Sequence, residues 1–192
     1  MSTFAIIMFA ATLFFAYQIF RHVQSLEDTT SADSMNPVPL VDPNELVGEA
    51  DDAYQNGDLA AAREKLQQAY ALVPDDIEIV NKLAFVHGKL EEPEEAIRLY
   101  ALSLQMDDTD DLTHNALASL YRTQGSLTLA KEHYEKALRI DNTYAVTYYN
   151  YGNLLGDLGE KKEAEAMYLK AIELDRDLTE ARSALEALRN AE

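Results

Sequence analysis

Small and large apolar residues recur along the chain with a period of 34 residues, starting near residue 43. Four alanines share one phase of this period. Each is followed four positions later by a large side chain, and three positions after that by a small one. Offsets of three and four place such residues on one face of a helix. The three columns are Ala62, Ala96, Ala130 and Ala164, then Leu66, Tyr100, Tyr134 and Tyr168, then Ala69, Ser103, Ala137 and Ala171.

Turn and capping residues divide each repeat into two helices. Asp42 is a typical helix N-cap, and Pro43 follows it at the first helical position, where proline is favoured. Gly125 and Ser126 pair a residue that ends one helix with a side chain that caps the next. We predict first helices at 43–56, 77–90, 111–124 and 145–158, and second helices at 59–73, 93–106, 127–140 and 160–174.

The small residues also predict how the two helices of a repeat meet. Helices joined by a short turn approach closely only where their side chains are small. One hairpin cannot bury both of its faces, so hairpins stack and the last one needs a cover. Residues 179–192 are predicted to form this cap helix, with Ala181, Leu185 and Leu188 on its apolar face and Asp177-x-x-Glu180 at its start. The small residues of the first helices are Ala50, Ala84, Ala118 and Gly152.

This pattern resembles the tetratricopeptide repeat (TPR) family over residues 43–178. The fourth repeat matches best, with Tyr148, Gly152 and Gly159, whereas the second has Glu-Glu-Pro at 91–93 where the family prefers Gly. The resemblance implies an all-α, right-handed TPR solenoid of four helical hairpins plus the C-terminal cap helix. Its repeats are 43–76, 77–110, 111–144 and 145–178.

The N-terminal segment has a different character. Residues 1–20 contain no charged side chain, and about 20 apolar residues in a helix span one hydrocarbon thickness. We expect a single transmembrane helix as an anchor over residues 1–22, ahead of the solenoid. The competing interpretations are a cleaved signal peptide or a hydrophobic helix docked on a partner. A signal peptide would require a basic residue ahead of its apolar core, and no basic residue precedes Phe4.

A linker is predicted between the anchor and the repeats. Residues 23–42 are polar and acidic, and Pro37 and Pro39 block regular structure. Arg21 is the only Lys or Arg near the anchor and lies on its C-terminal side. The positive-inside rule therefore favours repeats on the cytoplasmic side. We expect a single-pass membrane protein of a bacterial inner membrane.

The composition excludes several functional classes. The formal net charge is −18, from 34 acidic and 16 basic residues, whereas duplex binding needs clustered Lys and Arg that displace counterions. Nucleic acid is therefore not an expected partner. The chain has no Cys, which excludes disulfides, thiolate catalysis and cysteine-based zinc sites.

The sequence contains no constellation of residues for catalysis, a metal or a cofactor. The four His form no H-x-x-x-H or H-E-x-x-H pair, and no phosphate loop or nucleophile elbow occurs. His87 and His114 fall at interior positions of hairpins, where we expect buried, hydrogen-bonded histidines. The acidic residues 107–111 lack the Gly and the distal Glu of an EF-hand. We expect helix capping there rather than calcium binding.

By the resemblance, the first helices line a concave groove that accepts an extended segment or a helix of a partner. Tyr148 and Tyr151 occupy core positions of the family, so among these neighbouring tyrosines only Tyr149 is expected to point into the groove. The groove residues implied are Val47, Asp51, Tyr54 and Gln55 from repeat one, Asn81, Lys82, Phe85 and Lys89 from repeat two, Asn115, Ser119 and Arg122 from repeat three, and Tyr149, Asn150 and Asn153 from repeat four.

Two features of this groove suggest a ligand. An Asn side chain both donates to and accepts from a peptide backbone, and four Asn line the groove. Lys82, Lys89 and Arg122 are the only basic residues on the predicted first helices. We hypothesise that the groove binds a peptide with an acidic side chain or a C-terminal carboxylate near repeats two and three. The alternative is that these are solvated positions without ligand preference. The two-carboxylate clamp of chaperone-binding relatives is not reproduced.

These features indicate a membrane-anchored scaffold or adaptor that binds a partner polypeptide in its groove, and not an enzyme. One alternative is a chaperone-like protein that holds secretory or assembling clients at the membrane. Another is a self-assembling scaffold, in which the groove of one molecule takes the linker or terminal helix of another. No cofactor is expected.

Overall fold

The computed structural model describes residues 41–190. The chain divides into two units, Met1–Val41 and Asp42–Glu192, and the second carries the described helices. The predicted anchor at 1–22 and residues 23–40 of the predicted linker lie outside the described residues. Within residues 41–190, no helix is long and apolar enough to cross a membrane.

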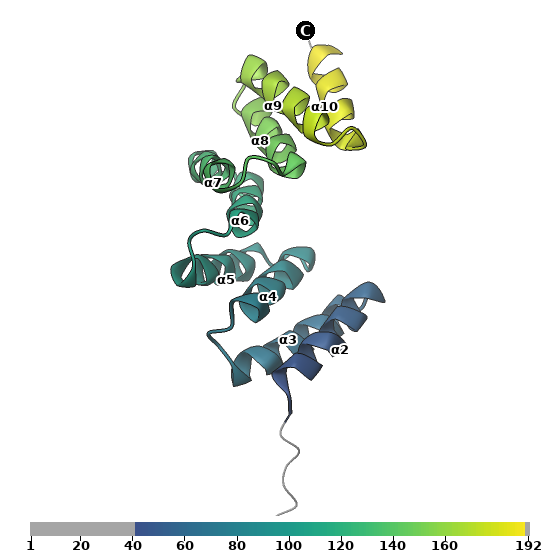
Figure 1. Ribbon diagram of the computed structural model, residues 1–192, viewed down its shortest axis with the longest axis vertical. Coiled ribbons are helices and arrows are strands. Elements are labelled where there is room, and N and C mark those ends of the chain that lie inside the picture. Colours follow the sequence, from purple (N-terminus) through teal and green to yellow (C-terminus); the bar gives the residue numbers. More distant parts are fainter. Residues whose placement is uncertain (1–40, 191–192) are drawn as a thin grey trace, which may run out of the picture. The chain divides into compact units, whose positions relative to one another are not determined.

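The described residues are helical almost throughout (Figure 1). The predicted first and second helices are present with nearly the predicted bounds. The first helices end one residue early, because residues such as Asn56 and Gln124 act as C-caps. The helices are α2 (Pro43–Gln55), α3 (Leu59–Leu72), α4 (Ile77–Lys89), α5 (Pro93–Met106), α6 (Asp111–Thr123), α7 (Leu127–Ile140), α8 (Ala145–Asp157), α9 (Lys161–Leu174) and α10 (Thr179–Asn190).

Consecutive helices pair into hairpins. Helix α2 pairs with α3, α4 with α5, α6 with α7 and α8 with α9, and each hairpin contacts the next through its second helix. Figure 1 shows the four pairs following one another, with α10 beside α9. The predicted stack of helical hairpins is confirmed, and its right-handed sense stays a prediction.

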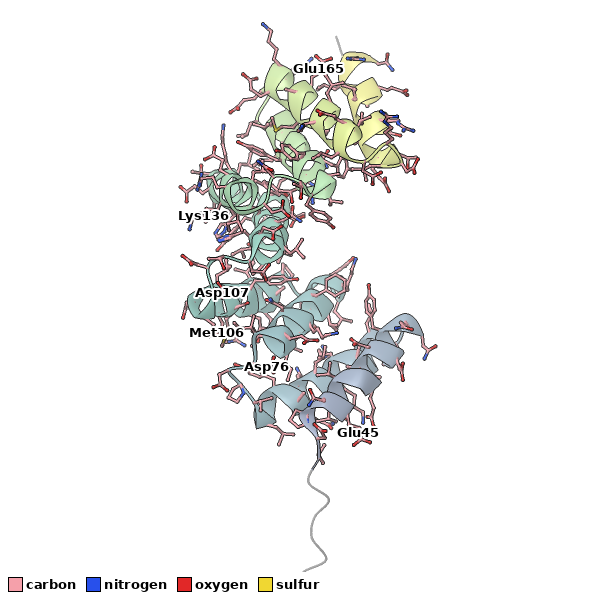
Figure 2. The ribbon with its side chains drawn as sticks, viewed as in Figure 1. Glu45, Asp76, Met106, Asp107, Lys136 and Glu165 are labelled. Atoms are coloured by element: carbon pink, nitrogen blue, oxygen red, sulfur yellow. The ribbon has the colours of Figure 1, made fainter. Side chains whose placement is uncertain are left out.

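Aspartates start three of the four first helices. The Asp42 carboxylate accepts a hydrogen bond from the Asn44 backbone N–H (2.9 Å), as the sequence predicts. Asp76, labelled in Figure 2 at the turn before α4, accepts from Glu78 and Ile79. Each such cap contributes about 1 kcal/mol to helix stability.

Two predicted caps are wrong. The Ser126 side chain makes no capping hydrogen bond, although its backbone N–H donates to the Tyr121 carbonyl (2.8 Å). At α10, Asp177 directs its backbone N–H to the Asp175 carboxylate (2.8 Å), in a local turn outside the predicted capping box.

The turns inside the hairpins need a residue with positive φ. Gly57, Gly125 and Gly159 adopt φ values of 80°, 77° and 76°, a conformation that costs glycine nothing. The corresponding turn of the second repeat places Glu91 at φ 59°. A side chain with a Cβ is strained in this region by roughly 1–2 kcal/mol. The departure of residues 91–93 from the family pattern therefore changes the strain of the turn and not the architecture.

The hairpin cores follow the predicted columns. Ala62, Ala96, Ala130 and Ala164 are fully buried, as are the small residues that face them from the first helices. In repeat four the approach is closest: a Cβ at Gly152 would lie 2.6 Å from Cε1 of Tyr168. Ala181 and Leu185 of α10 are buried, which confirms the predicted cover of the last hairpin.

Ion pairs join some neighbouring repeats. Arg63 on α3 pairs with Glu92 (2.7 Å), and two repeats later Lys131 on α7 pairs with Glu160 (3.0 Å). Both carboxylates belong to the residue just before the second helix of the following repeat. The equivalent positions between repeats two and three hold Ile97 and Ser126. Because these pairs are partly exposed, each contributes little, on the order of 0–1 kcal/mol.

Replacing Glu91 with Gly is expected to stabilise the repeats. The glycine removes the strain at positive φ and gains about 1 kcal/mol, which raises the melting temperature by a few degrees. Thermal unfolding followed by circular dichroism measures this. As the matched control, Gly125→Ala introduces a Cβ at the same turn position of repeat three and should lower the melting temperature. A lower melting temperature for Glu91→Gly would contradict the assignment of strain.

Candidate functional site

Two aromatic side chains of the predicted groove are exposed beside each other. Tyr54 on α2 and Phe85 on α4 make an edge-to-face contact, with ring centroids 5.4 Å apart. Phe85 is 41% exposed and Tyr54 38%. We call these residues the aromatic pair. An exposed Phe packed against an exposed Tyr from the neighbouring repeat is an apolar surface for a partner.

Hollows lie on both sides of Phe85. The first hollow, between α2 and α4, has a volume of about 210 Å³. The second hollow, between α4 and α6, has a similar volume of about 210 Å³. Phe85 lines both. The first is lined by Ala50, Asp51, Tyr54, Leu66, Lys82, Phe85 and Val86, and the second by Phe85, Gly88, Lys89, Tyr100, Ala116, Ser119 and Leu120.

Phe85 is unusual among the residues at its position in the repeat. The equivalents 34 residues apart are Asp51, Ser119 and Asn153, all polar. A polar residue is expected where a helix faces water. A phenylalanine that stays 41% exposed at this position has no role in the core, which makes it the most distinctive residue of the groove.

Two of the three predicted groove cations already have carboxylate partners within the chain. The Lys82 ammonium lies 2.7 and 2.8 Å from the two Asp51 oxygens, and the Arg122 guanidinium lies 2.7 Å from Asp157. Lys89 differs, because its Nζ lies 5.1 Å from the centroid of the Phe85 ring. Among the described residues it has no carboxylate within ion-pair distance. The charge available for a partner is therefore concentrated at Lys89.

The groove asparagines mainly bond to the protein itself. Asn81 donates to the Asp110 carboxylate (3.2 Å) and Asn150 donates to the Asn115 side chain (3.2 Å). Asn153 accepts from the Tyr168 hydroxyl (2.9 Å). These bonds link neighbouring repeats or the two helices of one repeat, so in this structure the asparagines have a structural role.

Tyr149 is not free in the groove. Its ring lies 6.2 Å from that of Tyr168 between centroids, and it packs against the core of the last repeat. The part of the predicted groove in repeats three and four is thus mostly engaged in contacts within the chain. The part in repeats one and two carries the exposed aromatic pair.

Several residues of the second hollow lie outside the set that the sequence predicts. Gly88 and Ala116 leave room for it, while Tyr100 and Leu120 form apolar walls. The equivalent of Gly88 in repeat one is Tyr54, and the equivalent of Ala116 in repeat two is Lys82. Comparing the repeats for unusually small residues on the first helices is the sequence signal that could have found them.

The expected buried histidines are confirmed. His87 is 5% exposed and its Nδ1 hydrogen-bonds to Glu92, while His114 is 2% exposed. His114 and His133 share a hydrogen bond between their Nδ1 atoms (2.8 Å), and His114 Nε2 lies 3.2 Å from the Asp108 carbonyl. Burial, with help from His114 and Lys136, lowers the pKa of His133 to about 4. Burial also lowers the pKa of His114.

The acidic residues 107–111 serve the local backbone. Asp110 caps α6 through the N–H groups of Leu112 and Thr113. Asp107, labelled in Figure 2 between α5 and α6, accepts from the backbone and hydroxyl of Thr109 (2.9 and 2.7 Å). These bonds lower the pKa of the Asp107 carboxyl. The predicted capping role is confirmed, and the described residues contain no group of three or more metal-binding side chains.

The stacked hairpins define a helical-repeat protein. The face formed by its first helices carries the hollows and the aromatic pair. Two models of the tetratricopeptide repeat match the chain, one over residues 53–120 and the other over residues 108–177. Together they cover more than half of the sequence. The chain belongs to the tetratricopeptide repeat family.

Similar proteins agree with this fold. Protein O-mannosyl-transferase TMTC2 from Homo sapiens is 33% identical over 85 residues, 43% of this chain. That match spans 10% of the human protein. The structure of MamA 41-end from Desulfovibrio magneticus RS-1 has a TM-score of 0.70 at 13% identity, covering 78% of this chain and 84% of that one. The first TPR of Spaghetti (RPAP3), bound to the HSP90 peptide SRMEEVD, has a TM-score of 0.58 at 21% identity, covering 60% and 91%.

The stability of the repeats is expected to fall between pH 6.5 and about 4. His114 and His133 have pKa values below the ordinary 6.5 in the folded protein, so the unfolded chain takes up protons first as the pH falls. The stabilisation from the neutral pair is complete above pH 6.5 and is lost as the pH falls toward the folded pKa. Denaturant unfolding at a series of pH values measures this loss.

The variant His133→Gln provides the control for this prediction. Its amide can donate to His114 but does not titrate, so its stability should fall less steeply between pH 6.5 and 5. Most carboxylates stay ionised in that range and contribute little to the slope. Equal slopes for the variant and the parent protein would show that the histidine pair is not the cause.

Proposed function

We propose that this protein is an interaction scaffold that binds a partner polypeptide at the aromatic pair and its two hollows. Tetratricopeptide repeat proteins are generally scaffolds for protein–protein interaction. The observation that carries the proposal is the exposed Phe85 between two hollows. Burying an aromatic side chain contributes roughly 1.5–3 kcal/mol to association, and aromatic residues dominate the energetics of many interfaces.

The related structures support the proposal by analogy. The first TPR of Spaghetti (RPAP3) is bound to a peptide in its structure, and this chain has the same fold. The sequence match with the human transferase spans 10% of that protein. No transferase activity is therefore carried over to this chain.

We also propose that residues 1–22 anchor the scaffold in a bacterial inner membrane, with the repeats on the cytoplasmic side. The support comes from the uncharged run before Arg21 and from the positive-inside rule. An anchored groove would recruit its partner to the membrane surface. If the repeats lay on the other side, a chaperone-like role toward secretory clients would take precedence.

The side of the membrane is measurable with a protease. Protease added to the outside of cells whose outer membrane has been permeabilised should leave the repeats intact if they are cytoplasmic. Lysis of the inner membrane should then make them cleavable. Cleavage before lysis would place the repeats outside the cytoplasm and contradict this part of the proposal.

The binding site is testable with a photo-crosslinking residue at position 54. A partner crosslinked from this position should be lost in Phe85→Ala, because losing the buried aromatic surface weakens binding by about tenfold or more. The control is Leu129→Ala on α7, since Leu129 is exposed to the same extent as Phe85 (42% against 41%). Equal crosslinking in the two variants, analysed by mass spectrometry of the adduct, would contradict the proposed site.

A further inference from the structure

We propose that the segment that occupies this site carries two large apolar side chains, one on each side of Phe85, and an acidic side chain that meets Lys89. This inference rests on the proposed function and names the chemistry of the partner. It follows from three observations: the shared wall of the hollows, their lining, and the position of the unpaired cation.

Phe85 is the wall between the hollows, because it lines both. A segment that fills both must therefore cross its ring. The hollows lie on the two sides of α4, and a helix with its side chains is about 10 Å across. An extended chain advances about 3.3 Å per residue, so it covers this distance in about three residues. The two apolar side chains of the partner therefore lie within about three positions of each other.

The lining of the hollows selects apolar side chains. Leu66 and Val86 contribute to the first hollow, and Tyr100, Ala116 and Leu120 contribute to the second. The charged groups at the first hollow, Lys82 and Asp51, neutralise each other at 2.7 Å. A charged side chain entering there would lose its hydration without gaining an uncompensated opposite charge.

The position of Lys89 indicates where the acidic side chain of the partner segment lies. Lys89 is exposed, it lines the second hollow, and its Nζ lies over the Phe85 ring. Asp51 and Asp157 already compensate the charges of Lys82 and Arg122 within the chain, so these two cations attract a further carboxylate less than Lys89 does. A carboxylate beside the second hollow would reach Lys89 while its neighbouring apolar side chain enters the hollow. Partial exclusion of water by the partner strengthens such a charge pair.

Selection from a random library of displayed 12-residue peptides tests the inference. The purified full chain is the target, and peptides that also bind Phe85→Ala are removed. We expect the remaining peptides to share two large apolar residues within three positions and an Asp or Glu beside them. A selected peptide, synthesised with a fluorescent label, should bind Lys89→Glu roughly tenfold more weakly. Replacing its acidic residue with Lys should restore binding to that variant.

The control is Lys136→Glu, which makes the same change in net charge on α7 (Figure 2). It should leave the affinity of the peptide unchanged. If the Phe85-dependent peptides lack an acidic residue, or if the two Lys variants bind them equally, the inference fails while the binding site stands. If no selected peptide depends on Phe85, both the inference and the proposed function fail.

Discussion

The close approach of the two helices in each hairpin is the constraint on which this structure depends. Ala62 and its three equivalents are fully buried against small residues of the facing helix. At Gly152 the approach is so close that a Cβ would collide with the Tyr168 ring. Because close packing tolerates neither a void nor an extra methyl group at such a contact, the same small residues return every 34 positions. The hairpins therefore share one geometry.

A shared geometry leaves the outward face of the first helices free to differ between repeats. Asp51 and Asn153 occupy the position of Phe85 in repeats one and four. Asp51 pairs with Lys82, and Asn153 accepts a hydrogen bond from Tyr168. Both side chains serve contacts within the chain. Phe85, at the same position of the second repeat, is not part of the hydrophobic core and stays exposed. The proposed binding site is thus a departure from the pattern, on a backbone that the pattern holds constant.

The local signals in the sequence predicted the helices well because each depends on neighbouring residues only. Asp42 caps a helix two residues away, and Gly125 ends one at a positive φ. The failures are also local: Ser126 makes no capping hydrogen bond, and Asp177 enters a turn with Asp175. The sequence predicted the groove as a set of positions. The structure shows which of these residues have hydrogen-bond or ion-pair partners within the chain. Lys82, Arg122 and the asparagines bond within the chain, whereas Lys89 does not.

By itself, the sequence determined the repeat, its helices and its hairpin core, because these follow from periodicity and from contacts over a few residues. The tertiary structure alone decided which groove residues bond within the described part of the chain and which stay exposed. That outcome depends on side chains about 30 residues apart, such as Lys82 with Asp51 or Arg122 with Asp157, whose distances no periodicity specifies. It also revealed the two hollows, since each is formed by residues from consecutive repeats around Phe85. A cavity between repeats exists only once their helices are packed.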